Sequence, residues 1–134
     1  MAKVTVQFMG KKETILVIDD NPDLLDIVDA VLSESGYMVA KALSGEIGLT
    51  IARNLHPQLI LLDLNMPRMD GWEVLKLLKS EETTQQIPVA IFSVRSDIKD
   101  KIFGLQRGAV DYIPKPFQYD QLADRVKRIL AQAS

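Results

Sequence analysis

Five short apolar runs alternate along the chain with longer segments in which apolar residues recur every three or four positions. The runs predict β-strands over residues 14–18, 37–42, 58–62, 88–92 and 109–113. The remaining segments predict amphipathic helices that begin near residues 21, 44, 71, 96 and 119. Strands that alternate with helices are typical of a parallel sheet covered on both faces, which is an α/β fold.

Two of these helices carry apolar stripes that bear on later observations. The second helix, capped by Ser44, is expected to bury the stripe formed by Ile47, Ile51 and Leu55. The apolar residues that the fourth helix is expected to present are Ile98, Ile102, Phe103 and Leu105.

Polar side chains stand just past the ends of the apolar runs. Asp19 and Asp20 follow the first run, Asp63 follows the third, Ser93 follows the fourth, and Lys115 comes shortly after the fifth. The carboxyl ends of parallel strands meet in one crevice, so these residues are expected to lie together. Carboxylates, a hydroxyl and an ammonium in one place suit a divalent metal and a phosphoryl group.

The three carboxylates favour a divalent cation. Like charges in one crevice raise one another's pKa unless a cation compensates them. Mg²⁺ suits the site because it prefers oxygen ligands and binds through one or two carboxylates plus phosphate oxygens. An Asp-Asp pair before a helix is often only a cap, but Asp63 on the neighbouring strand argues against that interpretation.

The bulk properties narrow the class further. The 134 residues suit one domain, with 47% hydrophobic and 25% charged residues. A net charge of −2 gives no general reason to expect nucleic-acid binding, and the absence of cysteine excludes disulfides and thiolate metal sites. No apolar run approaches the roughly 20 residues that span a bilayer. We therefore expect a cytoplasmic protein.

Four segments together resemble the receiver domain of response regulators in two-component signalling (CheY-like), over roughly residues 13–131. They are ILVIDDN at 15–21, LLDLNMPRMDG at 61–71, Ser93, and GAVDYIPKPF at 108–117. No single segment is specific, but their order and spacing match that family. The resemblance implies the flavodoxin-like (βα)5 three-layer sandwich with sheet order 2-1-3-4-5, which the number of predicted strands allows.

The resemblance also implies a role for each polar residue. Asp63 would be the phosphoacceptor, and Lys115 would pair with the phosphoryl group. Asp20 would bind Mg²⁺ directly, Asp19 would support it mainly through water, and the backbone carbonyl of Asn65 would complete the protein ligands. Mn²⁺ is a possible substitute for Mg²⁺.

Ser93 and Tyr112 would form the switch, since in this family the hydroxyl moves towards the phosphate and the aromatic ring turns inward behind it. The Lys115–Pro116 bond is commonly cis. The phosphodonor would be a sensor histidine kinase or a histidine phosphotransfer protein. The changed surface, around the fourth helix, fifth strand and fifth helix, would act on an unknown downstream protein or a tethered output domain.

The resemblance implies a monomer or a weak phosphorylation-dependent dimer, with no direct nucleic-acid binding and no membrane association expected. By the same resemblance, the protein would catalyse only its own phosphoryl transfer and autodephosphorylation and would not otherwise be an enzyme. Two alternatives stay open: a degenerate receiver that interacts constitutively, and a small Mg²⁺-dependent phosphatase with an aspartate nucleophile. The phosphatase would be expected to carry a second aspartate where Asn65 stands.

Three positions would tune dephosphorylation: Asn65, Val94 and Arg95. Val94 is bulkier than the residue usual there, and our hypothesis is that Val94 or Arg95 shields the acyl phosphate. Residues 1–12 stand apart from the domain, as a short strand, a disordered arm or residues foreign to it. Residues 132–134 are expected to form a tail.

Overall fold

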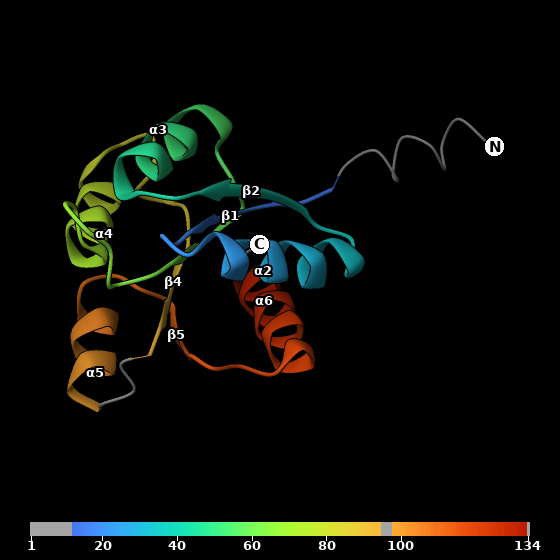
Figure 1. Ribbon diagram of the computed structural model, residues 1–134. Coiled ribbons are helices and arrows are strands. Elements are labelled where there is room, and N and C mark those ends of the chain that lie inside the picture. The colour runs from blue at the N-terminus through green and yellow to red at the C-terminus, as the bar shows by residue number, and fades with distance from the viewer. Residues whose placement is uncertain (1–11, 95–97, 134) are drawn as a thin grey trace.

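The computed structural model describes residues 12–94 and 98–133, arranged as alternating strands and helices (Figure 1). The predicted extension, apart from Lys12, and Arg95 therefore lie outside the described residues. The elements are β1 (Thr14–Ile18), α2 (Pro22–Glu34), β2 (Met38–Ala42), α3 (Gly45–Leu55), β3 (Leu59–Leu62), α4 (Gly71–Ser80), β4 (Val89–Ser93), α5 (Ile98–Gln106), β5 (Asp111–Pro114) and α6 (Tyr119–Ala133).

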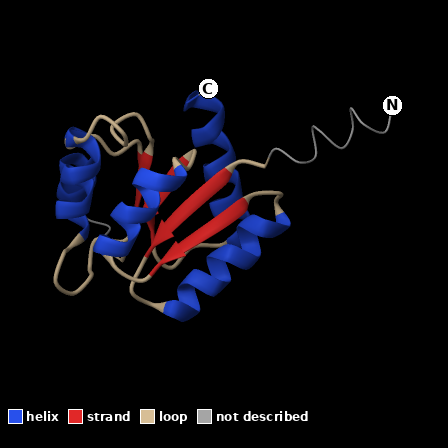
Figure 2. Ribbon diagram, turned by 90° about the horizontal axis from the view of Figure 1, so that it is seen from above, coloured by secondary structure: helices blue, strands red, loops and turns tan. Residues whose placement is uncertain are grey.

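The strands form one parallel sheet in the order β2-β1-β3-β4-β5, which confirms the predicted flavodoxin-like fold. All four residues of β3 and all five of β4 are buried, because helices cover both faces of the sheet. The sheet is the middle of three layers (Figure 2). The chain order brings every strand's carboxyl end to the same edge of the sheet.

Each face of the sheet is covered by its own helices (Figure 1), and each has its own apolar core. On one face α3, α4 and α5 cover side chains such as Ile18 and Ile60. On the other, α2 and α6 cover side chains such as Val17 and Phe92. Within the described residues, no helix is long and apolar enough to cross a membrane.

The predicted inward stripe of α3 is wrong for two of its three residues. Ile47 is 50% exposed and Leu55 is 45% exposed, while the buried residues of the helix are Gly45, Gly48, Leu49 and Ala52. A Cβ on Gly48 would lie 2.4 Å from Ile18 Cδ1. Where the helix crosses Ile18 it packs so close to the sheet that only a glycine fits at the contact.

The apolar residues of α5 also turn outward, and Ile98 is 73% exposed. Only Gly104 is buried among the residues of this helix. β5 begins two residues later than predicted because the Ala109 amide donates to the Gly104 carbonyl, as part of the helix end. α6 runs on to Ala133, into the predicted tail.

Candidate functional site

Three carboxylates meet at the carboxyl edge of the sheet. Asp19 and Asp20 directly follow β1, and Asp63 directly follows β3, the neighbouring strand. One oxygen from each lies within 4.8 Å of the others. Asp19 and Asp63 are buried, at 1% and 4% exposure, whereas Asp20 is exposed. The structure thus brings together the acidic residues that the strand ends predict.

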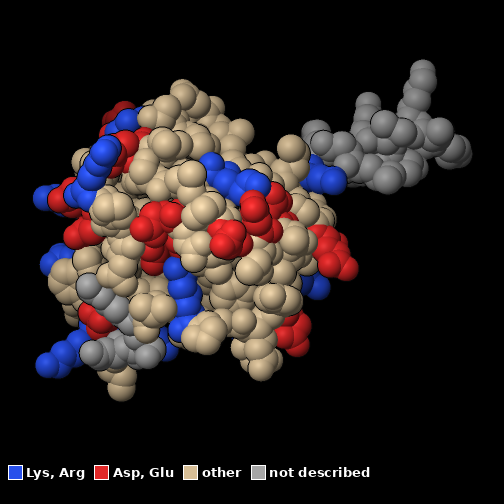
Figure 3. All heavy atoms as spheres, viewed as in Figure 1, with Lys and Arg blue, Asp and Glu red and all other residues tan. Residues whose placement is uncertain are grey.

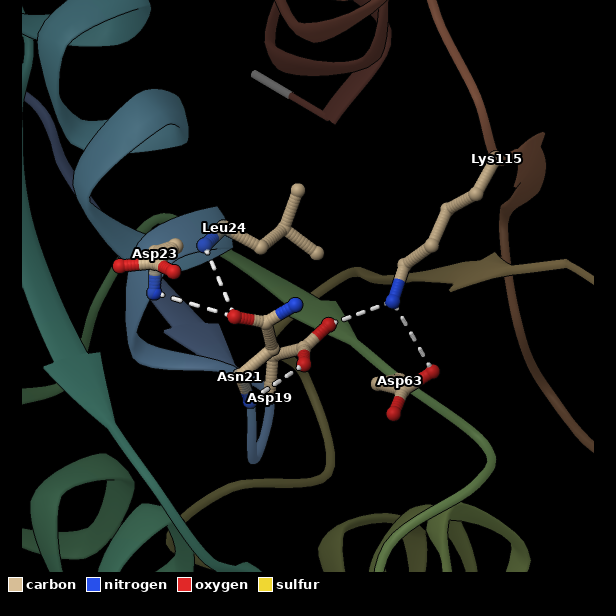
Figure 4. Close-up of polar contacts among 6 residues, drawn as sticks. All are labelled: Asp19, Asn21, Asp23, Leu24, Asp63 and Lys115. Carbon is tan, nitrogen blue, oxygen red and sulfur yellow. Dashed lines mark hydrogen bonds and ion pairs between the residues drawn. The ribbon is translucent and has the colours of Figure 1, made fainter.

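Lys115 reaches the same place from the end of β5 (Figure 4). Its Nζ donates to Asp19 Oδ2 at 2.6 Å and to Asp63 Oδ1 at 3.3 Å. The ammonium also lies 4.9 Å from the centre of the Phe92 ring, within the range of a cation–π contact. The peptide bond from Lys115 to Pro116 is cis, as the resemblance implies.

Backbone hydrogen bonds fix the direction of the Asp19 side chain (Figure 4). Its Oδ1 accepts from the Asn21 amide at 2.9 Å, which leaves Oδ2 for Lys115. Asn21 in turn caps α2, because its side-chain oxygen accepts from the amides of Asp23 and Leu24. The turn that caps the start of α2 therefore also orients the Asp19 carboxylate in the site.

Burial is the main cause that raises the pKa of Asp63 above its ordinary value, and the nearby charge of Asp19 raises it further. The ammonium of Lys115 and a hydrogen bond from the Asn65 amide act in the opposite direction but do not cancel the shift. A divalent cation among these oxygens would favour the ionised carboxylate. The clustered oxygen donors fit Mg²⁺, for which Asp19, Asp20 and Asp63 are the candidate side-chain ligands.

The switch candidates, Ser93 and Tyr112, are both buried. Ser93, the last residue of β4, is 0% exposed, and its carbonyl accepts from the Lys115 amide at 2.8 Å. Tyr112 is 2% exposed, so its ring lies inside the molecule. Of the residues proposed to tune dephosphorylation, Val94 and Asn65 are exposed, with Val94 at 63%.

The space-filling view shows acidic side chains gathered near the middle of one face (Figure 3).

Two features of the site were not predicted from the sequence. Gly71, the first residue of α4, lies so close to Asp63 that an added Cβ would be 2.3 Å from the Asp63 carbonyl oxygen. Phe92 lies beneath Lys115. The Asp70-Gly71 turn was visible in the sequence, but no local signal shows what a glycine or a buried ring contacts.

Comparison with known families identifies the class. The family model described as the response regulator receiver domain matches residues 15–127, so the chain belongs to this family. It is a receiver domain of the two-component response regulators, a class that serves mainly signalling.

Curated relatives include the DNA-binding dual master transcriptional regulator RpaA of Synechocystis, 41% identical over 116 residues. That match covers 87% of this chain and 48% of RpaA. The probable transcriptional regulator ycf27 of Porphyridium aerugineum is 42% identical over 120 residues, 90% of this chain and 49% of that protein. The chain thus spans about half the length of these relatives. The expectation of no direct nucleic-acid binding gains no support here, since the matches leave half of each relative uncompared.

Solved structures show the same fold. A response regulator from Chloroflexus aurantiacus has a TM-score of 0.85 and 35% identity, covering 90% of this chain and 99% of that chain. The chemotaxis protein CheY4 of Vibrio cholerae has a TM-score of 0.84 and 26% identity, covering 89% and 99%.

Proposed function

We propose that this chain is a phosphorylation-dependent switch in which Asp63 accepts a phosphoryl group from a phosphohistidine. The donor is a sensor histidine kinase or a histidine phosphotransfer protein. The observation that carries this proposal is the position of the Asp63 carboxylate, beside two further carboxylates and 3.3 Å from the Lys115 ammonium.

The transfer needs a nucleophile and a neutralised phosphoryl group more than it needs covalent help from other side chains. An Asp63 oxygen attacks phosphorus, a P–O bond forms, and the P–N bond to the donor imidazole breaks. The leaving imidazole nitrogen keeps the electron pair of the broken bond and takes up a proton. Burial raises the pKa of Asp63, and a nearby cation would favour the ionised carboxylate that attacks.

Each remaining residue of the site holds or neutralises charge. Asp19 and Asp20, with Asp63 and the backbone carbonyl of Asn65, are the proposed ligands of Mg²⁺, which supplies electrostatic stabilisation of phosphoryl oxygens when bound. Lys115 pairs with a phosphoryl oxygen in place of one of its present carboxylate partners.

The product carries about −1.5 to −2 charges and strong acceptor oxygens. In the proposed switch, Ser93 donates to one of these oxygens, and the buried ring of Tyr112 keeps the inward position behind it. Ser93 ends β4 and Tyr112 lies in β5, the strands that precede and follow α5 in the chain. Among its residues α5 contributes only Gly104 to the buried set, so apolar burial holds this helix weakly. A shift of α5, β5 and α6 would alter the surface seen by a downstream protein or a tethered output domain.

A full switch from 1:99 to 99:1 needs about 5.5 kcal/mol of differential interaction, but a smaller bias suffices for a graded signal. Val94 or Arg95 is proposed to shield the acyl phosphate. If Val94→Ala and Arg95→Glu both leave the hydrolysis rate of the phosphorylated protein unchanged, that shielding role is wrong.

The test of the proposed function is the intact mass after incubation with acetyl phosphate and Mg²⁺. The wild type is expected to gain one phosphoryl group, and the gain should disappear without Mg²⁺ and in Asp63→Asn. A protein that gains none even from a phosphorylated histidine donor would be a constitutive interaction domain instead. Steady turnover of a phosphoester would support the phosphatase alternative.

A further inference from the structure

The outer edge of β2 has backbone groups that no described strand covers. β2 ends the sheet, and its Met38 amide donates to the Glu13 carbonyl on the β1 side at 2.9 Å. Alternate residues of a strand bond to opposite sides, so Ala40 also bonds inward. The amides and carbonyls of Val39 and Lys41 therefore point outward from the sheet.

A lysine on an edge strand commonly prevents the edge from pairing with another chain, because burying its free charge is unfavourable. Lys41 does not carry a free charge of this kind. Its Nζ lies 3.2 Å from Asp26 Oδ1 and 3.1 Å from Asp29 Oδ2, both on α2. Its charge is already compensated within the chain, so this edge lacks a free cation at its centre.

An apolar surface adjoins the same edge on the opposite face of the sheet. It is the outward stripe of α3: Ile47 and Leu55, which are exposed, and Ile51, which is partly buried. Arg53 lies about 200° around the helix from Ile51, and it pairs with Glu81 at the end of α4 at 2.7 Å. The stripe therefore lies on the side of α3 away from α4, towards β2.

β2 continues this apolar surface. Met38, on the same face of the strand as Ala40, is 56% exposed, and Ala40 and Ile51 pack against the same core. The result is an open strand edge with an apolar strip on one side and a mixed acidic and basic cluster on the other.

We propose that a second copy of this chain covers the edge, with the two β2 strands paired antiparallel about a twofold axis at Ala40. In this register Val39 of each copy faces Lys41 of the partner subunit, and the two residues exchange backbone hydrogen bonds. The axis is normal to the sheet, so each α3 stripe meets its copy and each cluster of Lys41, Asp26 and Asp29 meets its copy. The apolar stripes are self-complementary, as an isologous interface requires, and in each cluster Lys41 stays paired with Asp26 and Asp29 of its own chain.

This interface is separate from the surface of α5, β5 and α6 invoked in the proposed function, and it does not depend on phosphorylation. The pairing joins two five-stranded sheets into one continuous sheet.

Sedimentation velocity on the full chain tests the proposal over a concentration series without phosphodonor. We expect the mass to rise reversibly from 15.0 kDa towards twice that value. Amide hydrogen exchange gives the location: protection of the Val39 and Lys41 amides should rise with protein concentration, because those amides become donors across the interface.

Two variants separate this interface from the α5 surface. The double variant Ile47→Gln and Leu55→Gln is expected to weaken association at least about tenfold. The control, Ile102→Gln with Leu105→Gln, changes two α5 residues that are each 50% exposed and should leave association unchanged. Val39→Pro removes an amide that points outward from the sheet, and an edge strand tolerates proline at such a position. This variant should also weaken association, while its circular dichroism spectrum stays native.

Three results would overturn the proposal. One is a monomer at all concentrations up to about 1 mM. Another is association that the α5 control abolishes and the α3 variant spares. The third is association that appears only when residues 1–11 are removed, because the chain's own N-terminal segment would then be the occupant of the edge.

Discussion

Gly71→Ala should disturb the fold and the site together. A Cβ at this position would lie 2.3 Å from the carbonyl oxygen of Asp63 and 2.6 Å from Leu64 Cα, whereas ordinary contacts begin near 3.4 Å. Both neighbours are backbone atoms, so no side chain can rotate out of the way. Either the start of α4 or the segment that carries Asp63 must move by about 1 Å.

The size of the effect follows from that displacement. Overpacking a core costs about 1–3 kcal/mol, and an unyielding backbone neighbour places this variant near the upper end. Alanine gains up to about 1 kcal/mol over glycine within a helix, and less in its first turn. We therefore expect a net loss of about 2 kcal/mol in the free energy of unfolding, equivalent to roughly 8 °C in Tm for a domain of this size.

Urea unfolding followed by circular dichroism measures the loss, and intact mass measures phosphorylation by acetyl phosphate, which should slow because Asp63 is displaced. The matched control is Gly104→Ala, whose Cβ would meet Ile91 Cδ1, the far end of a flexible side chain, at 2.5 Å. That control should stay within about 1 kcal/mol of wild type. If Gly71→Ala is as stable as the control, or is phosphorylated at the wild-type rate, the steric reasoning is refuted.

Three further predictions concern charge, a buried hydroxyl and a helix cap. Because the pKa of Asp63 is raised in the folded state, its ionised form destabilises the fold near neutral pH, and this penalty vanishes as pH falls through the raised value towards 3.8. Without divalent cations, Asp63→Asn should therefore have a higher urea midpoint than wild type near neutral pH and a similar one below about pH 4; a gap that persists in acid would contradict this. Thr84→Val removes the buried hydroxyl that donates to the Leu78 carbonyl at 2.7 Å and should cost about 1–2 kcal/mol in urea unfolding, whereas an unchanged midpoint would show that the bond contributes nothing. Asn21→Ala removes the acceptor at the start of α2 and should cost about 1 kcal/mol in thermal unfolding, with Asn21→Ser expected to restore most of it.

The weak attachment of α5 is relevant to the proposed switch. Ile98, Ile102 and Leu105 are at least half exposed, Phe103 packs edge-on against Trp72, and Gly104 is the one buried residue of the helix. Little apolar area therefore opposes a shift of α5. A phosphoryl group on Asp63 would need only a modest preference of Ser93 for one arrangement to bias it.

The sequence by itself determined the sheet and the residues at its carboxyl edge. Buried strands need unbroken apolar runs, so the local pattern alone predicted strands over 58–62 and 88–92, where β3 and β4 lie. Polar residues directly after such runs must lie at the strand ends. The gathering of Asp19, Asp63 and Lys115 followed because parallel strands share one carboxyl edge.

Only the tertiary structure decided how closely the helices pack and, for α3, which face is buried. Hydrophobic pattern predicted that Ile47 and Leu55 of α3 would face inward, yet Gly48 lies against Ile18 and turns them outward. Likewise the approach of Gly71 to Asp63 and of Lys115 to Phe92 depends on distances between segments far apart in the chain. A glycine contributes no hydrophobic signal to a sequence pattern, and its contribution to packing exists only once another element lies against it.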